Sequence, residues 1–431
     1  MNILILNGSP KGENSVTLQT MRYIRECFPG HTYRELHVGQ RIRSFEKDFS
    51  AARESLLAAD LLVFCYPVYT FLVPSQLHRF IELIKEDGVD LRGRYATQLS
   101  TSKHFYDTTA HEFIRQNCED LGLHFIPGLS ADMEDLLKEK GQREAESFFR
   151  HVLWAAGDAS VKAPATKKTR RIAIVADLAE GTEELSCMIE RFREACPYSC
   201  DIVDLRQFPF AGGCLGCFHC ASDGTCVYKD GFDEFLRKNI QTADATVYAF
   251  AVKDHSMGYR MKMYDDRQFC NGHRTVTMGK PVGYLIQGDL EREPNLRQLI
   301  EARAQVGGNH LAGVVCSGDG SETAVEQLSA ELVYAVETDF QQPANFYGVG
   351  GMKIFRDLIY QMQGLMKEDH RFYKEHGFYD FPQKKKGTIL GMYLVGAMMN
   401  NKKLSKKIGS NMTKGMLMPY EKVLEKVRKK R

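Results

Sequence analysis

Four cysteines lie within thirteen residues in the spacing C-x2-C-x2-C-x5-C: Cys214, Cys217, Cys220 and Cys226. Thiolates are soft ligands, and a loop of this kind is typical of an iron–sulfur cluster or a zinc ion. Structural zinc sites usually pair two C-x2-4-C knuckles across a longer spacer, whereas consecutive C-x2-C-x2-C steps are typical of clusters. The spacing therefore favours a [4Fe–4S] cluster, with zinc and four unligated thiols as the alternatives.

A second candidate site follows a short apolar stretch at the start of the chain. Residues 7–17 join the apolar run 3–6 to a helical pattern that carries Leu18, Met21 and Ile24 on one face. A helix N-terminus at the carboxyl end of a buried strand can bind a phosphate. The alternative is an ordinary Gly-Ser-Pro turn with a helix cap. The candidate phosphate-binding residues are Ser9, Lys11, Asn14, Ser15, Val16 and Thr17.

Two further loops should reach the same sheet edge, because each follows a strand of the predicted parallel sheet. The loops at 67–71 and 100–106 carry aromatic and polar side chains that suit a flat aromatic ligand, although the aromatic residues could instead fill a core. Lys103, His104 and Tyr106 are candidates for tuning or proton delivery, and His104 and Tyr106 are the candidate catalytic residues. The candidate ligand-binding residues are Pro67, Val68, Tyr69, Thr70, Phe71, Ser100, Thr101, Ser102 and His104.

The elements that position these loops repeat along the chain. Buried strands near 3–6, 61–65, 95–101 and 123–126 alternate with helices, and the pattern restarts at residue 172. Such alternation predicts an α/β protein with two tandem, doubly wound parallel sheets. The predicted divisions are a first domain, a linker, a second domain with the cysteine loop, a helical extension and a basic tail, at residues 1–156, 157–170, 171–345, 346–383 and 384–431.

Two sets of residues resemble known families. Gly8-Ser9-Pro10-Lys11 and Pro67-Val68-Tyr69 resemble the flavodoxin-like NAD(P)H-dependent FMN reductases over about residues 1–155, although Lys11 stands where that family usually has Arg. This resemblance implies a five-stranded sheet, FMN phosphate on residues 9–17, and isoalloxazine on the loops at 67–71 and 100–106, with NAD(P)H stacking directly on the flavin. The cysteine motif resembles the iron–sulfur flavoproteins of the same superfamily, over about residues 171–340.

The two copies differ in their chemistry. The second copy has Asp177, Glu180, Glu183 and Glu184 where a phosphate would bind, and the first copy has no cysteine loop. We therefore expect FMN in the first domain and the cluster in the second, facing each other in a pseudo-dimer, with a homo-oligomer also possible. The predicted function is electron transfer between NAD(P)H or ferredoxin and a small-molecule or protein redox partner. The alternatives are an FMN or quinone reductase with a zinc or empty cysteine loop, a non-catalytic flavodoxin-type carrier, and an adaptor.

Charge is distributed unevenly along the chain. Residues 384–431 contain twelve Lys, two Arg and two Glu, a net charge of +12, which leaves −10 for residues 1–383 out of a total of +2. A basic tail on an acidic body argues against a nucleic-acid-binding domain. The apolar run 387–399 between lysine clusters is too short to span a bilayer; it fits peripheral membrane contact, docking on the protein itself, or a solvated terminus. Without a secretion signal, we expect a cytoplasmic protein.

Overall fold

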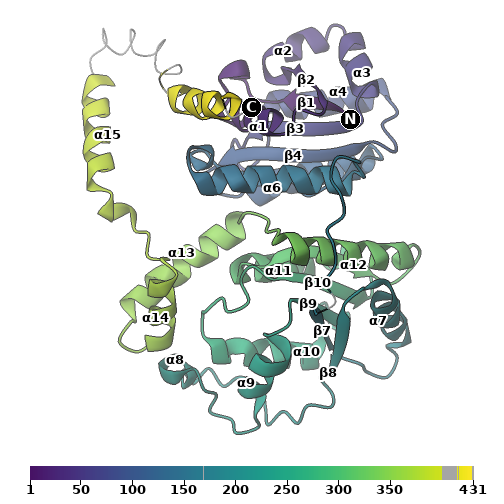
Figure 1. Cartoon of the computed structure of the whole chain (residues 1–431), viewed down its shortest axis with the longest axis vertical. Coiled ribbons are helices and arrows are strands. Elements are labelled where there is room, and N and C mark those ends of the chain that lie inside the picture. The colour runs from purple at the N-terminus through teal and green to yellow at the C-terminus, as the bar shows by residue number, and fades with distance from the viewer. Residues whose placement is uncertain (168, 400–414, 416, 430–431) are drawn as a thin grey trace. The chain divides into compact units, whose positions relative to one another are not determined.

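The computed structural model describes residues 1–167, 169–399, 415 and 417–429. The chain divides into two compact units, Met1–Lys162 with Phe381–Arg431, and Ala163–Asp380 (Figure 1). The division between Lys162 and Ala163 falls inside the predicted linker. We call the first unit the first domain and the second unit the second domain. No helix of the described residues combines the length and the apolarity that crossing a bilayer would require.

The first domain is built on a parallel sheet. Its strands are β1 (Asn2–Asn7), β2 (Thr32–Leu36), β3 (Leu61–Pro67), β4 (Tyr95–Ser102), β5 (His124–Phe125) and β6 (Leu129–Asp132). Their order is β2-β1-β3-β4-β5, and β6 also pairs with β4. The fifth position of the expected five-stranded sheet is thus divided in two, because Pro127 and Gly128 interrupt the strand and Pro cannot donate to the ladder.

Helices cover both faces of this sheet, as the buried apolar strands require. They are α1 (Val16–Cys27), α2 (Val38–Phe45), α3 (Ser50–Leu57), α4 (Ser75–Asp87), α5 (Asp107–Asp120) and α6 (Glu139–Ala155). Alternate residues of β1 enter opposite cores: Leu4 and Leu6 pack with α2 and α4, whereas Ile3 and Ile5 pack with α1 and α6.

The second domain repeats this plan. Strands β7 (Arg171–Ala176), β8 (Ser199–Asp204), β9 (Ala245–Ala251), β10 (Pro281–Gln287) and β11 (His310–Cys316) form a parallel sheet in the order β11-β10-β9-β7-β8. Both domains therefore have the order 2-1-3-4-5 of the flavodoxin-like fold, which confirms the predicted fold class. The longer helices are α7 (Glu183–Ala195), α10 (Gly258–Arg267), α11 (Pro294–Gly307) and α12 (Ser321–Thr338).

The helical extension packs within the second domain, as predicted. Helices α13 (Phe346–Gln361) and α14 (Lys367–Glu375) place Ile359 and Tyr373 in one apolar cluster with Ala221. Ala221 belongs to the short helix α8 (Cys220–Asp223) inside the cysteine loop. The extension thus packs against the cysteine loop.

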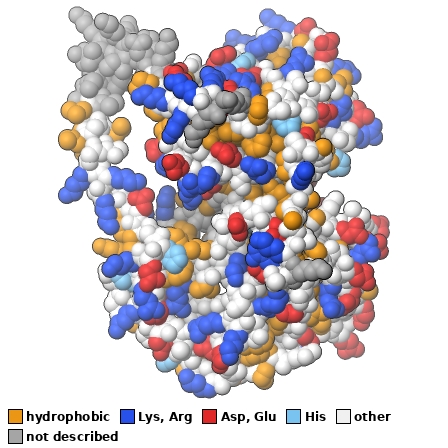
Figure 2. Space-filling model, in the orientation of Figure 1, with side chains coloured by type: hydrophobic (Ala, Val, Ile, Leu, Met, Phe, Trp, Pro, Cys, Tyr) orange, Lys and Arg blue, Asp and Glu red, His pale blue; other side chains and the backbone are white. Residues whose placement is uncertain are grey.

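The basic tail contains two helical segments of different character. Helix α15 (Lys386–Met399) exposes Leu390 and Tyr393, and Figure 2 shows hydrophobic and lysine side chains together on this segment. The second lysine cluster, residues 402–407, lies outside the described residues. Residues 417–428 form a helix that buries its apolar face on the first domain, where the Tyr420 hydroxyl donates to the Met133 carbonyl at 2.7 Å. This part of the tail therefore docks on its own chain.

Candidate functional site

The loop after β1 places the N-terminus of α1 at the sheet edge. Gly12 adopts a left-handed φ of +54°, a conformation that favours glycine at this turn, and the end of the Gln40 side chain lies against it. Ser15 is the N-cap of α1, and its hydroxyl accepts from the Leu18 N–H at 3.5 Å. The first-turn N–H groups of a helix have no intrahelical acceptor, so those of α1 can bind an anion.

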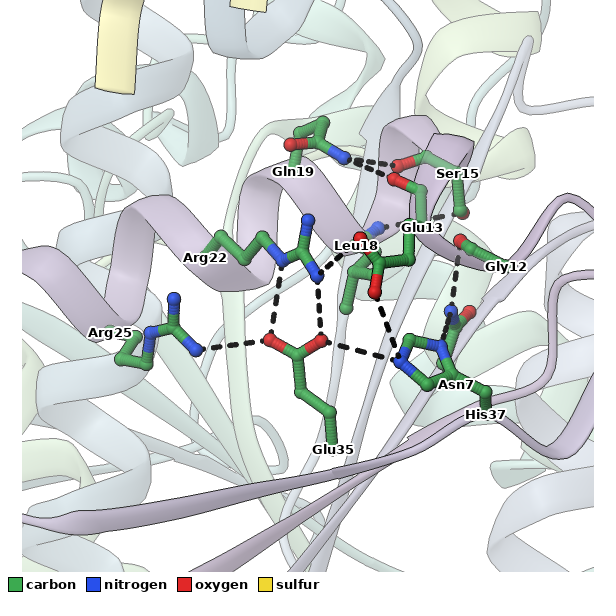
Figure 3. Close-up of polar contacts among 10 residues, drawn as sticks. All are labelled: Asn7, Gly12, Glu13, Ser15, Leu18, Gln19, Arg22, Arg25, Glu35 and His37. Atoms are coloured by element: carbon green, nitrogen blue, oxygen red, sulfur yellow. Dashed lines mark hydrogen bonds and ion pairs between the residues drawn. The ribbon is translucent and has the colours of Figure 1, made fainter. Parts of the chain in front are cut away.

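Polar contacts behind the loop fix its shape (Figure 3). The buried Asn7 side chain donates to the Gly12 carbonyl at 3.0 Å and accepts from the Ser9 N–H at 3.2 Å. Arg22 of α1 forms two hydrogen bonds with Glu35 of β2, at 3.2 and 2.8 Å. Burial raises the pKa of Glu35, but the positive charges of Arg22, Arg25 and His37 together outweigh burial, and the net pKa is lowered. The ion pair therefore ties α1 to the neighbouring strand at neutral pH.

The loop after β3 forms a tight, strained turn. Thr70 and Phe71 both have positive φ, at 48° and 70°, which costs side-chain-bearing residues about 1–2 kcal/mol each. The Tyr69 N–H donates to the Leu72 carbonyl at 2.8 Å, and the Thr109 hydroxyl of α5 donates to the Phe71 carbonyl. These bonds hold the turn in a conformation that Gly would normally occupy.

Aromatic side chains gather beside this turn. Phe71, Phe105 and Tyr106 form a triangle with ring centroids 5.1–5.3 Å apart, and all three are more than 40% exposed. Tyr69 is exposed to a similar degree. Exposed rings held on strained backbone suit a ligand with a flat aromatic group.

The three loops surround one pocket of about 320 Å³. Most of the predicted binding residues line it: Ser9, Lys11, Ser15, Val16, Thr17, Pro67, Val68, Tyr69, Thr70, Phe71, Thr101 and Ser102. The hydroxyls of Thr17 and Thr101 lie 2.6 Å apart and join α1 to β4 at the pocket floor. Lys103, Phe105 and Met133 also line the pocket. Met133 comes from a fourth loop, which follows β6. The sequence did not predict this loop, because strand β6 is short.

Three predicted binding residues lie outside this lining. Asn14 is exposed to solvent. The Ser100 hydroxyl lies 2.8 Å from Nε2 of the partly buried His111, and desolvation lowers the pKa of His111 to about 4. Nδ1 of His104 lies 3.0 Å from the carboxylate of the fully buried Asp107. His104 and Ser100 therefore belong to a buried polar layer behind the pocket.

Of the other two candidates for tuning, Lys103 is an exposed lysine whose ammonium lies 2.8 Å from the Asp132 carboxylate. Tyr106 stands at the aromatic triangle beside the pocket, with a positive φ of 53°. Of the two candidate catalytic residues, Tyr106 is therefore the one whose ring contacts the aromatic residues that line the pocket.

The second domain keeps the strained turn without the aromatic residues. After β9, Asp254 and His255 have φ of 50° and 59°, and Lys253 pairs with Ser256 as Tyr69 pairs with Leu72. The turn is therefore a feature of the duplicated fold. What distinguishes the first domain is the set of aromatic side chains that the turn presents.

The cysteine loop is anchored at its base by a buried ion pair. Arg267 of α10 donates to both carboxylate oxygens of Asp230 and to the Gly212 carbonyl, each at 2.8 Å. Its guanidinium also stacks over the rings of Tyr228 and Phe232, at 4.6 and 5.0 Å. The two ends of the loop are thus held together, while Gly216 and Gly224 supply left-handed turns within it.

The four thiols differ in their surroundings. Cys214 and Cys217 are exposed, and Cys220 and Cys226 are partly buried. Burial raises the pKa of Cys220 to about 11, and its Sγ lies 3.1 Å from the Phe269 carbonyl. Among the described residues, no three His, Cys, Asp or Glu side chains are gathered in metal-binding geometry. The donor set, four thiols on one glycine-containing loop, nevertheless has the chemistry that an iron–sulfur cluster requires.

Comparison with known proteins agrees with this description. Over residues 1–148 the chain matches the family described as having the flavodoxin-like fold. An iron–sulfur flavoprotein from Archaeoglobus fulgidus is 28% identical over 176 residues, which cover 38% of this chain and 79% of that protein.

Two solved structures are similar to part of this chain. A flavodoxin, WrbA-like protein from Agrobacterium tumefaciens is 13% identical, over 40% of this chain and all of that one, with a TM-score of 0.29. An FMN-dependent NADH-azoreductase from Bacillus anthracis, in complex with FMN, is 15% identical over 36% of this chain and 97% of that one, with a TM-score of 0.28. The family match over residues 1–148 thus agrees with the flavodoxin-like strand order of the first domain.

Proposed function

We propose that the protein is a flavin-dependent oxidoreductase that binds FMN in the pocket of the first domain. The observation that carries this proposal is the pocket itself: a helix N-terminus, hydroxyls and a lysine lie on one side, and exposed aromatic rings on a strained turn lie on the other. This combination suits a ligand with a phosphate at one end and a flat ring system at the other.

The chain's own residues would divide the binding between them. Ser9, Ser15 and the N–H groups at the start of α1 would hold the phosphate, with Lys11 as counter-charge, and Tyr69 and Phe71 would contact the ring. FMN, when bound, accepts a hydride and releases electrons singly. The protein's contribution is to orient the ring, shield one face from water and leave a face open to NAD(P)H or another reductant.

We further propose that Cys214, Cys217, Cys220 and Cys226 hold a [4Fe–4S] cluster that exchanges single electrons with the flavin. The ligand spacing supports this, as does the similarity to an iron–sulfur flavoprotein. Zinc, or no metal, would leave a simple FMN or quinone reductase. Iron analysis separates these cases.

Lys11→Glu tests the flavin site. Losing one charge-assisted contact and adding a repulsion should weaken FMN binding at least ten-fold, from about 1.5–3 kcal/mol for such a bond. Lys47→Glu, at an exposed lysine of the same domain, is the matched control. The measurements are the FMN dissociation constant and the rate of anaerobic flavin bleaching by NADH and NADPH. Wild-type protein that binds no FMN would refute the proposal and favour an adaptor. FMN binding without NAD(P)H oxidation would favour a flavodoxin-type carrier.

A further inference from the structure

The second domain contains a cavity of about 220 Å³ that none of the chemistry above uses. It lies over the face of the sheet, between β9 and β10 on one side and α10 and α11 on the other, beneath residues 268–277. Tyr248 and Tyr284, which pair across β9 and β10 at mid-strand, form its floor. The cavity is therefore separate from the carboxyl sheet edge, where a flavin binds in this fold.

Hydrogen-bond donors line this cavity without partners. Among the described residues, Gln241 Nε2 and Arg274 Nη1 are buried and have no hydrogen-bond partner, and the buried Tyr264 hydroxyl has the Tyr248 phenol as its neighbour. Tyr264 is 1% exposed. Burial raises the pKa of both Tyr264 and Tyr284, so these phenols remain protonated donors at neutral pH.

Among the described residues that line the cavity, Asp265 is the one carboxylate, and it is already paired. The Asp265 carboxylate accepts from Arg303 of α11, which also lines the cavity. Behind the wall, Oδ1 of the buried Asp369 accepts from the His273 N–H at 2.7 Å, whereas its Oδ2 has no hydrogen-bond partner. A ligand that satisfies the free donors must therefore bring acceptor oxygens of its own.

Apolar side chains make up the rest of the wall. Phe250, Met257, Met261, Phe269 and Phe355 line the cavity together with the tyrosine rings. Flat rings and adaptable methionines favour an aromatic ligand, and the volume suits a single ring. Because one guanidinium nitrogen of Arg274 is free, a carboxylate is the acceptor that this wall can bind most strongly.

We propose that the second domain binds a small aromatic carboxylate in this cavity, with the ring among the tyrosines and the carboxylate on Arg274 and the Tyr264 hydroxyl. The site shares a wall with the cysteine loop. Phe269 lines the cavity, and its carbonyl accepts from the Cys220 thiol. A bound ligand would thus order the segment on which Cys220 rests. The proposal concerns only this domain and does not depend on FMN or on the cluster.

The test is calorimetric titration of the full chain with benzoate, benzamide and cyclohexanecarboxylate. Saturable benzoate binding is expected, with both other probes weaker. Tyr264→Phe, which removes only the hydroxyl, should weaken benzoate about five-fold, and Arg274→Gln at least ten-fold. Tyr259→Phe is the matched control, because Tyr259 lies on the same helix and is 75% exposed.

Three results would overturn the proposal. Absence of saturable binding of any probe would leave a water-filled cavity. Benzoate binding that is unchanged in both Tyr264→Phe and Arg274→Gln would place the ligand elsewhere. Equal affinity for benzamide and benzoate would refute the assignment to a carboxylate. Each readout is independent of flavin content, so failure here is distinguishable from failure of the proposed function.

Discussion

Replacing Arg267 with Met should release the base of the cysteine loop. The Arg267 side chain is 1% exposed and the Asp230 side chain 6%, and the two form a bidentate pair that also holds the Gly212 carbonyl. Asp230 further accepts from the Ala211 N–H at 3.0 Å. With Met in place of Arg, the carboxylate and the carbonyl would both lose their charged partner inside the domain.

The size of the effect follows from the pair. Hydrogen bonds from Arg267, together with those from the Ala211 and Phe232 N–H groups, lower the pKa of Asp230 from its ordinary 3.8 to about 2. At about 1.4 kcal/mol per unit, this shift corresponds to about 2 kcal/mol of stability. Leaving a buried charge unpaired costs about 3–5 kcal/mol in comparable cases. We expect Arg267→Met to destabilise the second domain by about 3 kcal/mol and to lower its iron content.

The pH dependence has a definite sign. Because the folded-state pKa of Asp230 is lowered, its contribution is complete above about pH 4 and is lost as the pH falls through about 2. Wild-type protein should therefore lose this stability in acid. Arg267→Met should lack this part of the acid dependence, since the pair is already broken.

The assay uses the distribution of fluorophores. The chain's single tryptophan, Trp154, lies on α6 of the first domain, so its fluorescence reports that domain alone. Calorimetry and hydrogen exchange of residues 211–230 report the second domain. Arg267→Met should lower the second-domain transition and leave the Trp154 transition unchanged. Lys262→Met, on the same helix with a half-exposed side chain, is the control. Equal stability and equal exchange in the two variants would refute the reasoning.

Three further predictions concern the first domain and the tail. Gly12→Ala should weaken FMN binding about ten-fold, since the left-handed backbone at this position costs a residue with a Cβ about 1–2 kcal/mol. Gly30→Ala, with no neighbour within 4 Å, should bind FMN normally, and similar dissociation constants for the two variants would contradict this. Tyr420→Phe removes the bond to the Met133 carbonyl beside the pocket and should cost about 1 kcal/mol in the Trp154 transition, and an unchanged denaturation midpoint would count against docking of this helix. Leu390→Glu should reduce co-sedimentation of the chain with anionic vesicles, because Leu390 is exposed on α15 among lysines; equal pelleting of variant and wild type would exclude α15 as a membrane contact.

The strands with the clearest sequence signal are those buried on both faces. Residues 3–6, 61–65 and 172–175 are uninterrupted apolar runs, and each lies inside a strand of the structure. Strand β2 was missed because it is an edge strand: Arg34 and Glu35 interrupt its apolar pattern, and four of its five residues are at least partly exposed. Helices α2 and α3 were not predicted from the sequence, because each is only eight residues long and its apolar pattern is short.

The candidate site divides in the same way. The phosphate loop and the Tyr69 turn are local motifs at strand ends, so their place at one pocket could be predicted from parallel topology. The inward turn of His104 could not, because it depends on Asp107 and Ser130, whose hydroxyl donates to Asp107 at 2.6 Å. The second-domain cavity could not be predicted from the sequence, because the residues that line it come from segments spread between residues 241 and 355.

The most direct test of the account is the content of FMN, iron and acid-labile sulfide per chain, in protein purified without oxygen. We predict a single FMN with about four iron and about four sulfide per chain. The Cys217→Ser variant should lose iron and keep FMN. FMN with zinc or without metal would contradict the cluster and leave a simple flavin reductase. Absence of FMN from protein with an intact first domain would contradict the central claim.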